Sequence, residues 1–397
     1  MTRAGAARPD TIRRHNLGLL LAQVHRDGEL TRAQLTNQLG LSRSTIGALV
    51  ADLTDLGLLH EHVPNGGARA GRPSHVVGPR DDGPYAVAVD VDVTHVTIAA
   101  VGIGGRVLVR EHLPMRPSPP DAETVASQVA EAMVRIRAGL PPDAWPVGVG
   151  VSVPGAVSLR DSVVEFAPNL NWRDEALGAV LARFLPPGMP VLVGNDADLA
   201  VRAEHLRGNA RECDDVVLLL GRIGVGAGLI ANGAPVRGHD GYAGELGHTV
   251  MDLTGVRCRC GKRGCMETFV GEGALLRQLG RRQKPTAARV AAVLIAAREG
   301  DREAARAVQT VGEALGRTVA WLVNALNPER VILCGFLAAV FVSEPKAVER
   351  SLSFHTMGSA GRTVELTTPA FGDDAVLLGA AELAFADLVA DPLGHIR

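Results

Sequence analysis

The chain has 397 residues, of which 46% are hydrophobic and 3% aromatic, and its formal net charge is -2. This length exceeds one typical domain, and the composition fits a globular α/β protein. No apolar run approaches the ~20 residues of a membrane-spanning helix, and the N-terminal run Leu19–Ala22 is too short for a signal peptide, so we expect a cytoplasmic protein without a membrane partner.

Charge is distributed unevenly along the chain. Residues 1–80 hold ten arginines, no lysine and six acidic residues, which gives a net charge of +4, so residues 81–397 carry -6. A basic N-terminal part on an acidic body is typical of a nucleic-acid-binding module joined to a second domain. An ordinary solvated surface also reaches +4, so charge alone does not decide between the two interpretations.

Residues 11–57 have the pattern of three helices. The first is expected over about 11–25 and the second over 32–39, after which Gly40 makes a tight turn and Ser42 caps the third helix. The apolar face of the third helix consists of Ile46, Leu49, Val50, Leu53 and Leu56. Two helices joined by a glycine-containing turn predict a helix-turn-helix.

The opposite face of the third helix begins with Arg43, Ser44 and Thr45. In helix-turn-helix modules the N-terminal residues of this helix contact base edges in the major groove. Arg43 is suited to guanine, and the two hydroxyl side chains are suited to bases or phosphates. We therefore expect these three residues to contact DNA.

A hairpin is expected directly after the third helix. Residues 58–63 alternate like a strand, residues 75–77 look like a returning strand, and a loop rich in glycine and arginine connects them. The loop carries Arg69 and Arg72, which can lie along a DNA backbone or enter a minor groove. The pattern predicts a winged helix-turn-helix domain over residues 1–80, with a small protein–protein module as the alternative.

From Tyr85 onward the pattern is that of a larger α/β domain, which we assign to residues 81–397. Strands are expected at 86–93, 97–102, 106–110 and 147–153, with a helix at 121–139. A second set has strands at 215–220, 228–230 and 330–333 and helices at 286–299 and 302–326. Ribonuclease-H-like sugar kinases and actin-like ATPases use this repeated order, so we expect two lobes whose strand ends face a cleft.

Three of the five cysteines lie within eight positions. Cys258, Cys260 and Cys265 follow His248, which lies ten residues before the first of them. Three thiolates and one imidazole are the donor set of a closed tetrahedral zinc site. Cysteines of a cytoplasmic protein indicate metal binding or free thiols rather than disulfides. We expect a structural Zn²⁺ ion here, with three unrelated free thiols as the alternative.

The residues around this cluster resemble a family signature. Glu245 and His248 lie in a Gly-Glu-x-Gly-His stretch, and Cys-x-Cys-Gly-x-x-Gly-Cys-x-Glu follows from Cys258 to Glu267. This pattern resembles the ROK family, named for repressors, open reading frames and kinases, and the resemblance covers nearly the whole chain. A winged module in front of it is the arrangement of the family's transcriptional regulators.

The resemblance also implies a sugar pocket. In kinases of the family, a Pro-Asn-Leu segment, an Asn-Asp pair and acidic and histidine residues of the zinc region hold the sugar hydroxyls. The corresponding residues here are Asn169, Asn195, Asp196, Glu245, His248 and Glu267. Asp196 stands where the kinases keep their general base, and such buried polar groups reject analogues that lack the matching hydroxyl. For Asn195-Asp196 alone, an Asx turn after a strand is the alternative.

The nucleotide side departs from the kinase pattern. Where kinases of the family have Asp-x-Gly-Gly-Thr, this chain has Asp92 and Val93 in place of the two glycines. In the second phosphate loop, Arg222 replaces a glycine and Ile223 replaces the threonine. An acidic side chain at Asp92 would repel phosphate, so we expect no enzymatic activity. An ATP-dependent sugar kinase with an added DNA-binding domain is the alternative.

A sugar pocket behind a DNA-binding module predicts a sugar-responsive transcriptional regulator, most simply a repressor of carbohydrate genes. Its partners would be double-stranded operator DNA, a small sugar effector and further copies of the chain in a homodimer or homotetramer. Zinc would fix His248 and thereby orient Glu245 and Glu267 around the pocket. A regulator that responds to a protein instead of a sugar is the remaining alternative.

Overall fold

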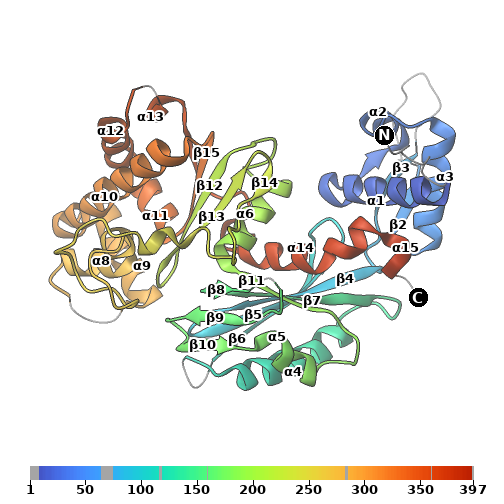
Figure 1. Ribbon diagram of the computed structural model, residues 1–397, viewed down its shortest axis with the longest axis horizontal. Coiled ribbons are helices and arrows are strands. Elements are labelled where there is room, and N and C mark those ends of the chain that lie inside the picture. Colours follow the sequence, from blue (N-terminus) through green and yellow to red (C-terminus); the bar gives the residue numbers. More distant parts are fainter. Residues whose placement is uncertain are drawn as a thin grey trace, which may run out of the picture.

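The computed structural model describes residues 9–63, 75–115, 119–158, 160–281, 285–358 and 360–395. An N-terminal domain lies at one end of the molecule and is followed by two lobes, each built on a five-stranded sheet (Figure 1). Both lobes follow the strand and helix order expected from the sequence.

The N-terminal domain packs three helices against a small sheet. Its elements are α1 (Pro9–Asp27), β1 (Leu30–Thr31), α2 (Arg32–Leu39), α3 (Arg43–Asp55), β2 (Leu59–His62) and β3 (Val76–Pro79). Thr31 and Ser42 cap α2 and α3 with their hydroxyl groups, and Gly40 ends α2 with a φ of 65°, as the sequence predicts. The sequence did not predict β1, which pairs with β3 in the order β1-β3-β2.

The first lobe is a sheet with the strand order β11-β7-β4-β5-β6. Its elements are β4 (Pro84–Val91), β5 (His95–Gly102), β6 (Val107–Pro114), α4 (Ala122–Ala138), β7 (Trp145–Val153), β8 (Ala156–Val157), β9 (Val164–Ala167), β10 (Trp172–Glu175), α5 (Leu177–Phe184) and β11 (Val191–Asn195). Strand β6 runs four residues beyond the predicted end at Arg110. Along β4, alternate side chains contact opposite layers, because Val87 and Val89 belong to the core under α4 and α5 whereas Ala86 and Ala88 face the other side.

The second lobe has the strand order β14-β13-β12-β15-β16. Its elements are α6 (Asp196–Arg207), β12 (Val216–Gly221), β13 (Val225–Ala231), β14 (Ala234–Pro235), η1 (Glu245–His248), α7 (Glu267–Val270), α8 (Glu272–Gln278), α9 (Ala287–Arg298), α10 (Arg302–Leu326), β15 (Arg330–Gly335), α11 (Phe336–Ser343), α12 (Pro345–His355), α13 (Ala360–Thr363), β16 (Glu365–Thr367) and η2 (Gly372–Asp374). The large core of this lobe lies under α10 and α11, and α6 covers the opposite face of the sheet.

Two helices join the parts of the molecule. Helix α14 (Ala375–Ala390) packs on α6 and on strands β4 and β7, and α15 (Pro392–His395) follows it. The backbones approach closely, because a Cβ at Gly150 of β7 or at Gly379 of α14 would overlap a carbonyl group of the facing element. Close packing at both glycines joins α6, α14 and the first sheet in one closely packed layer.

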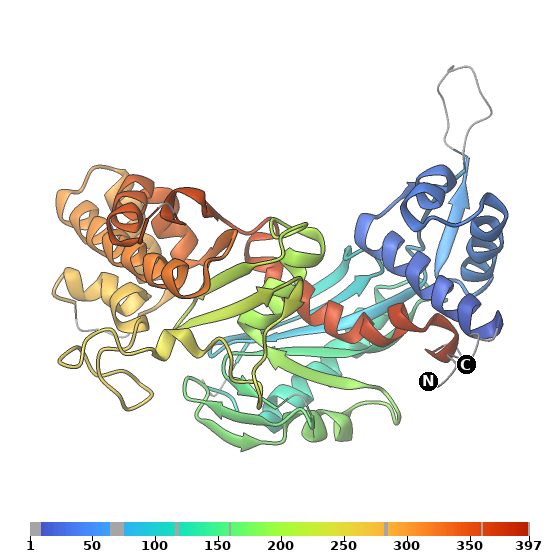
Figure 2. The same ribbon diagram turned by 45° about the horizontal axis from the view of Figure 1, so that its top comes forward.

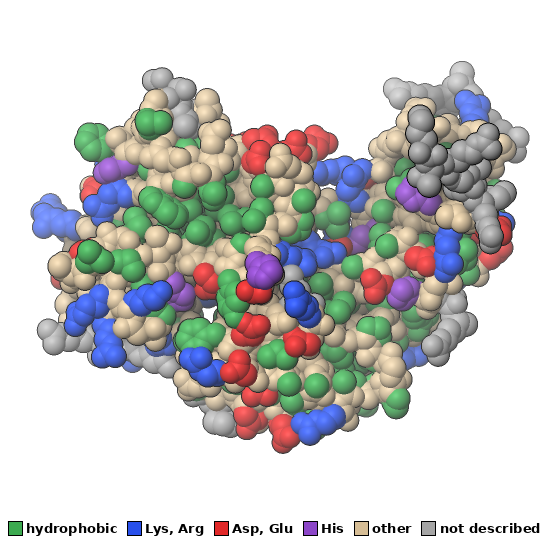
Figure 3. Space-filling model, in the orientation of Figure 1, with side chains coloured by type: hydrophobic (Ala, Val, Ile, Leu, Met, Phe, Trp, Pro, Cys, Tyr) green, Lys and Arg blue, Asp and Glu red, His purple; other side chains and the backbone are tan. Residues whose placement is uncertain are grey.

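The N-terminal domain shares its core with this layer. Leu17, Leu21 and Val77 belong to the same continuous hydrophobic cluster as Leu377 and Phe385 of α14. Figure 2 shows α14, in red, reaching from the lobes to α1, in blue. The surface is nevertheless hollowed between the N-terminal domain and the second lobe (Figure 3). Helix α14 therefore makes an extensive contact between the lobes and the N-terminal domain.

Within the described residues, none of the helices combines the length and the apolar character needed to cross a bilayer.

Candidate functional site

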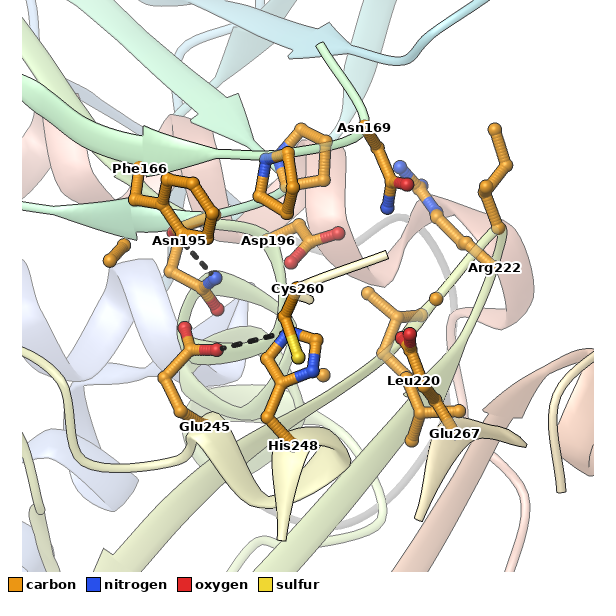
Figure 4. A pocket seen from close by; sticks show the side chains of 18 of the residues that line it. Phe166, Asn169, Asn195, Asp196, Leu220, Arg222, Glu245, His248, Cys260 and Glu267 are labelled. Carbon is orange, nitrogen blue, oxygen red and sulfur yellow. Dashed lines mark hydrogen bonds and ion pairs between the residues drawn. The ribbon is translucent and has the colours of Figure 1, made fainter. Parts of the chain in front are cut away.

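A cavity of about 320 Å³ lies between the two lobes, at the ends of their strands. The structure brings all six residues predicted for a sugar pocket to its wall: Asn169, Asn195, Asp196, Glu245, His248 and Glu267 (Figure 4). They come from four separate segments between β9 and α7, so only the folded chain assembles them. A volume of this size is at the lower end for small-molecule sites.

Asn195 has two roles at once. It is the last residue of β11 and the N-cap of α6, because its Oδ1 accepts hydrogen bonds from the N–H groups of Ala197 at 2.9 Å and Asp198 at 3.1 Å. Its Nδ2 donates to the carbonyl oxygen of Gly155 at 2.9 Å. The local role that was the alternative for this residue, a turn after the strand, is therefore present as a helix cap. The residue also lines the cavity, and the second N–H of its amide can donate to a ligand.

Asp196 opens α6 and faces the cavity (Figure 4). It is only 6% exposed, and burial raises its pKa to about 7, although the nearby Arg222 acts in the opposite direction. At neutral pH this carboxyl group therefore exchanges between a protonated and an ionised form. The protonated form can both donate and accept a hydrogen bond, and the ionised form accepts only.

The loop that carries the cysteines also holds two cavity residues. Arg259 donates a hydrogen bond to Oδ1 of Asn169 at 2.9 Å, which leaves the amide nitrogen of that residue for the cavity. The thiol of Cys258 contacts Oε1 of Glu267 at 2.8 Å. A Cβ at Gly224 would lie 2.9 Å from Oε2 of Glu267, so a larger residue there would displace this carboxylate at the cavity.

The predicted metal ligands converge in the structure. One donor atom from each of His248, Cys258, Cys260 and Cys265 lies within 4.8 Å of all the others. The Sγ atoms of Cys260 and Cys265 are 3.6 Å apart, and Sγ of Cys258 is 3.7 Å from Nδ1 of His248. A tetrahedral zinc ion with bond lengths of about 2.3 Å to sulfur and about 2.0–2.1 Å to nitrogen needs about 3.8 and 3.6 Å. The donor set therefore fits zinc in chemistry and in size.

His248 connects this cluster to the cavity. Its Nδ1 belongs to the donor set, and its Nε2 lies 4.0 Å from the Glu245 carboxylate, on the cavity side (Figure 4). Both residues lie on the short helix η1, whose preceding residue Gly244 has a φ of 100°. A ligand on one ring nitrogen fixes the direction in which the other nitrogen points.

Several cavity residues were not predicted from the sequence, and three of them carry aromatic or charged side chains. Phe166 of β9, Tyr242 and Lys262 also line the wall. The guanidinium of Arg173 lies 4.9 Å from the centre of the Phe166 ring, a cation–π contact that holds the ring in place. No short motif marks these side chains, although an aromatic residue in a strand next to Pro-Asn-Leu was visible in the sequence.

A second, larger cavity of about 930 Å³ lies on the far side of Arg222. The two cavities share part of their lining, namely Asp92, Val93, Leu220, Arg222 and Ile223. Arg222 binds Asp90 through two hydrogen bonds of 3.1 and 2.8 Å, and it lies 3.9 Å from Asp92. Since β4 and β12 belong to different lobes, this ion pair joins the lobes and forms a wall between the two cavities.

In the N-terminal domain, Arg43 and Ser44 are exposed at the start of α3. Thr45 is half-buried, and its hydroxyl lies 2.8 Å from that of Ser42, so it completes the cap. Arg13 is paired with Asp52. The predicted wing residues Arg69 and Arg72 lie outside the described residues.

A buried cluster of charged and polar groups joins the N-terminal domain to the lobes. Nε2 of His25 in α1 lies 2.7 Å from the Glu382 carboxylate of α14, whose other oxygen accepts from Arg207 at the end of α6. The N–H of Gly104 donates to Nδ1 of His25 at 3.0 Å, so the shared proton lies on Nε2. All three side chains of His25, Arg207 and Glu382 are less than a tenth exposed.

Comparison with known proteins supports the resemblance drawn from the cysteine motif. The sequence model of the ROK family matches residues 86–387. The xylose repressor of Bacillus subtilis strain 168 is 26% identical over 382 residues, which cover 95% of this chain and 97% of that protein. The DNA-binding transcriptional dual regulator NagC of Escherichia coli strain K12 is 26% identical over 339 residues, 82% of this chain and 81% of that protein.

Solved structures share the fold. A ROK family transcriptional regulator described as a homologue of the E. coli MLC protein has a TM-score of 0.77 and 25% identity, covering 97% of this chain and 99% of its own. A ROK family glucokinase from Streptomyces griseus, solved with glucose and AMPPNP, has a TM-score of 0.64 and 27% identity, covering 76% and 99%. The expected two-lobed ribonuclease-H-like fold of the actin and sugar kinase type is thereby confirmed. Because the family match spans well over half of the sequence, this chain belongs to the ROK family.

Proposed function

We propose that this protein is a sugar-responsive, DNA-binding transcriptional regulator, acting as a repressor of carbohydrate genes. The observation that carries the proposal is the connection between two sites. Six polar side chains surround one cavity, and the helix α6 that begins there with Asp196 ends at Arg207, next to the helix-turn-helix domain. The xylose repressor and NagC, which are similar over most of the chain, are named as a repressor and as a DNA-binding transcriptional regulator.

The DNA-binding part of the proposal places operator DNA against α3. Arg43 and Ser44 are exposed at its N-terminus, where recognition helices contact base edges. The hydroxyls of Ser44 and Thr45 both lie close to that of Ser42, at 2.9 and 2.8 Å, but only Thr45 is half-buried, so we assign Thr45 to the cap and to phosphate contact rather than to base contact. Arg69 and Arg72 would add contacts from the wing. Residues 1–80 would thus form the DNA-binding domain and residues 81–397 the effector and dimerisation domain.

The cavity chemistry favours an unphosphorylated sugar. Asp196, Glu245 and Glu267 offer carboxyl oxygens to hydroxyl groups, and Asn169 offers an amide N–H. Phe166 adds an apolar face of the kind that packs on a sugar ring. A phosphate group would meet three acidic side chains against Lys262 and Arg222, the latter already paired with Asp90, which makes phosphate less favourable here than a hydroxyl group. We therefore assign Asn169, Asn195, Asp196, Glu245, His248 and Glu267 to sugar binding.

His248, Cys258, Cys260 and Cys265 would hold a structural Zn²⁺ ion, which would supply four bonds that fold this loop and no catalytic step. The 3.6 and 3.7 Å separations within the donor set support this assignment. Arg259, which donates a hydrogen bond to Asn169, lies between two of these cysteines, so an ordered loop also orders this wall of the cavity.

Kinase activity is disfavoured by the wall between the two cavities. In a kinase the transferred phosphoryl group must approach the sugar hydroxyl in line and without obstruction. Here the Arg222–Asp90 ion pair separates the cavity of Asp196 from the larger cavity where a nucleotide would lie. Asp92 and Val93 stand on the same wall in place of the phosphate-loop glycines. We therefore propose that Asp196 is a sugar ligand here and not a catalytic base.

Sugar binding would reach the DNA-binding domain through α6. This helix of 12 residues spans about 18 Å and packs closely on α14. A sugar that binds one arrangement of the lobes more tightly than the other would displace Arg207 relative to His25, and operator affinity would change by that difference in binding. A homodimer or homotetramer would convert this displacement into a new spacing of two recognition helices. The exposed Phe354 and Met357 on and beside α12 offer apolar surface for such assembly.

The raised pKa of Asp196 gives a prediction about pH. A sugar hydroxyl donates more favourably to the ionised carboxylate, so sugar binding should release a proton, and affinity should rise with pH up to about 7. Well below pH 7 the change approaches about tenfold per pH unit. Calorimetric titration between pH 5.5 and 8.5 measures it. Asp196→Asn should bind more weakly with a shallower profile, since Glu245 of the same cavity also has a raised pKa, while the exposed Asp240→Asn keeps the slope. An equal slope in Asp196→Asn would contradict the assignment.

The proposal is tested by fluorescence anisotropy with the DNA upstream of the gene. We expect the protein to bind this DNA and one sugar of a monosaccharide panel to weaken the binding. Arg43→Ala should fold normally and lose at least about tenfold in DNA affinity. Arg298→Ala, in α9 of the second lobe, is the matched arginine control. Absence of DNA binding would overturn the proposal, release of ADP from ATP with that sugar would favour the kinase alternative, and a complex that responds only to cell extract would favour a protein effector.

A further inference from the structure

The outer face of the small sheet in the N-terminal domain carries a second group of metal-binding side chains. Glu29, His60 and His62 each present one donor atom, and these atoms lie within 4.8 Å of one another. Glu29 precedes β1, whereas the two histidines lie on β2 with one residue between them. Because alternate side chains of a strand point to the same face, His60 and His62 lie side by side, with ring centres 5.5 Å apart.

A glycine makes the meeting of Glu29 and His60 feasible. The sheet order is β1-β3-β2, so the backbones of Glu29 and His60 are separated by the middle strand and should be about 9–10 Å apart. Gly78 of β3 lies directly opposite His60, and a Cβ there would be 2.9 Å from Cγ of Glu29 and 3.0 Å from Cε1 of His60. Both side chains therefore lean over this glycine, and Nε2 of His60 comes to 3.8 Å from the carboxylate.

The ring of His60 is already oriented for a metal ion. Its Nδ1 lies 2.9 Å from the carbonyl oxygen of Pro79, an acceptor that requires the proton on Nδ1. The lone pair is then on Nε2, the nitrogen directed toward Glu29. A backbone carbonyl that fixes the second nitrogen is the usual outer partner of a metal-bound histidine.

We infer that Glu29, His60 and His62 form a second site, for a divalent transition-metal ion such as Zn²⁺, Co²⁺ or Ni²⁺. Two imidazoles and one carboxylate favour these ions over Mg²⁺ or Ca²⁺, and three protein ligands leave a position for water. The site is half exposed, so it should bind more weakly than the four-ligand cluster around His248. Zinc ligands need separations of about 3.3 Å, which exposed side chains reach by small rotations.

The location gives the site a consequence for DNA binding. A metal ion here would cross-link the connection between α1 and β1 to strand β2, across β3. Strands β2 and β3 lead into residues 64–74, which contain the predicted wing arginines. An ion would thus restrict the hairpin relative to the three helices, and preorganised surfaces bind with a smaller entropic cost. This consequence rests on the proposed DNA-binding function, whereas the metal site itself does not.

The experiment is a Co²⁺ titration of the full-length protein whose cysteine cluster is already loaded with zinc. We expect one further equivalent of Co²⁺ per chain, with an absorption spectrum that lacks the intense bands of thiolate-bound cobalt. His60→Ala and His62→Ala should each lower this affinity at least about tenfold. His75→Ala is the matched control, because this half-exposed histidine of the same hairpin faces Glu61 on the other side of the sheet.

A second variant keeps the inference falsifiable if a histidine substitution disturbs folding. Gly78→Ala removes no ligand, yet its methyl group should push Glu29 and His60 apart and weaken Co²⁺ binding, with thermal unfolding monitored in parallel. The inference is overturned if the wild-type protein binds no cobalt beyond the zinc-loaded cluster, or if His60→Ala, His62→Ala and His75→Ala bind it equally. In either case sugar-dependent DNA binding can persist, so the proposed function is judged separately by the anisotropy assay.

Discussion

Replacing Glu382 by alanine is expected to lower the free energy of unfolding by about 3–5 kcal/mol, because it removes the acceptor of a buried arginine. Arg207 and His25 both contact this carboxylate, and each is less than a tenth exposed. Although burial by itself would raise the pKa of Glu382, His25 and Arg207 lower it to about 2. Urea unfolding monitored by tryptophan fluorescence measures the change, and Asp387→Ala, an exposed residue of the same helix, is the matched control.

The same residue predicts a pH dependence of stability. The folded-state pKa of about 2 lies below the ordinary value of 4.5, so the ionised carboxylate contributes stability that is present above pH 4.5 and is lost as pH falls toward 2. This shift corresponds to about 3 kcal/mol. The stability difference between wild type and Glu382→Gln should therefore shrink below pH 4.5. A constant difference across this range would show that the ion pair contributes little.

Glu382 variants also test the path from the sugar cavity to the DNA. If α6 transmits the signal through Arg207, Glu382→Gln should retain sugar binding and yet lose much of the sugar effect on operator affinity. Calorimetry gives the first quantity and fluorescence anisotropy gives the second. A normal sugar effect in a folded Glu382→Gln protein would exclude this route, while leaving the sugar cavity and the DNA-binding domain unaffected.

Loss of the cluster metal is expected to have a comparable or larger effect. Cys258→Ser should remove the zinc ion that survives dialysis and lower the free energy of unfolding by about 4 kcal/mol or more, the range typical of losing a bound metal. Sugar affinity should fall about 10–100-fold, because His248 loses the metal ion that fixes its ring at the cavity, and Arg259, which holds Asn169, loses its ordered loop. Metal analysis, unfolding and calorimetry measure the three quantities.

The control for this experiment is Cys213→Ala. Cys213 is a buried cysteine in the core under α6, away from the four clustered ligands, so its replacement removes a thiol and leaves the cluster intact. It should retain metal and sugar affinity with a modest loss of stability. A Cys258→Ser protein that keeps both its zinc and its sugar affinity would show that the cluster has no such role.

Much of the fold follows from local patterns. The capping hydroxyls of Thr31 and Ser42 and the apolar spacing of α1 and α3 placed these helices within about two residues, because such signals act within one or two helical turns. The donor set from His248 to Cys265 is local too, and its residues do converge. The short strand β1 was missed, since two residues carry no periodicity and only pairing with β3 defines them.

The sequence by itself determined the family and the zinc-type donor set, because both depend on close spacing along the chain, and the family resemblance supplied the residue types around the cavity. Tertiary structure alone decided how these parts communicate. The Arg222–Asp90 pair joins residues 132 positions apart, and the His25–Glu382 pair joins residues 357 apart. Such buried hydrogen-bonded and charged pairs form only when two lobes or two domains are packed, since their energy depends on burial and distance in space and leaves no periodic trace in the order of residues.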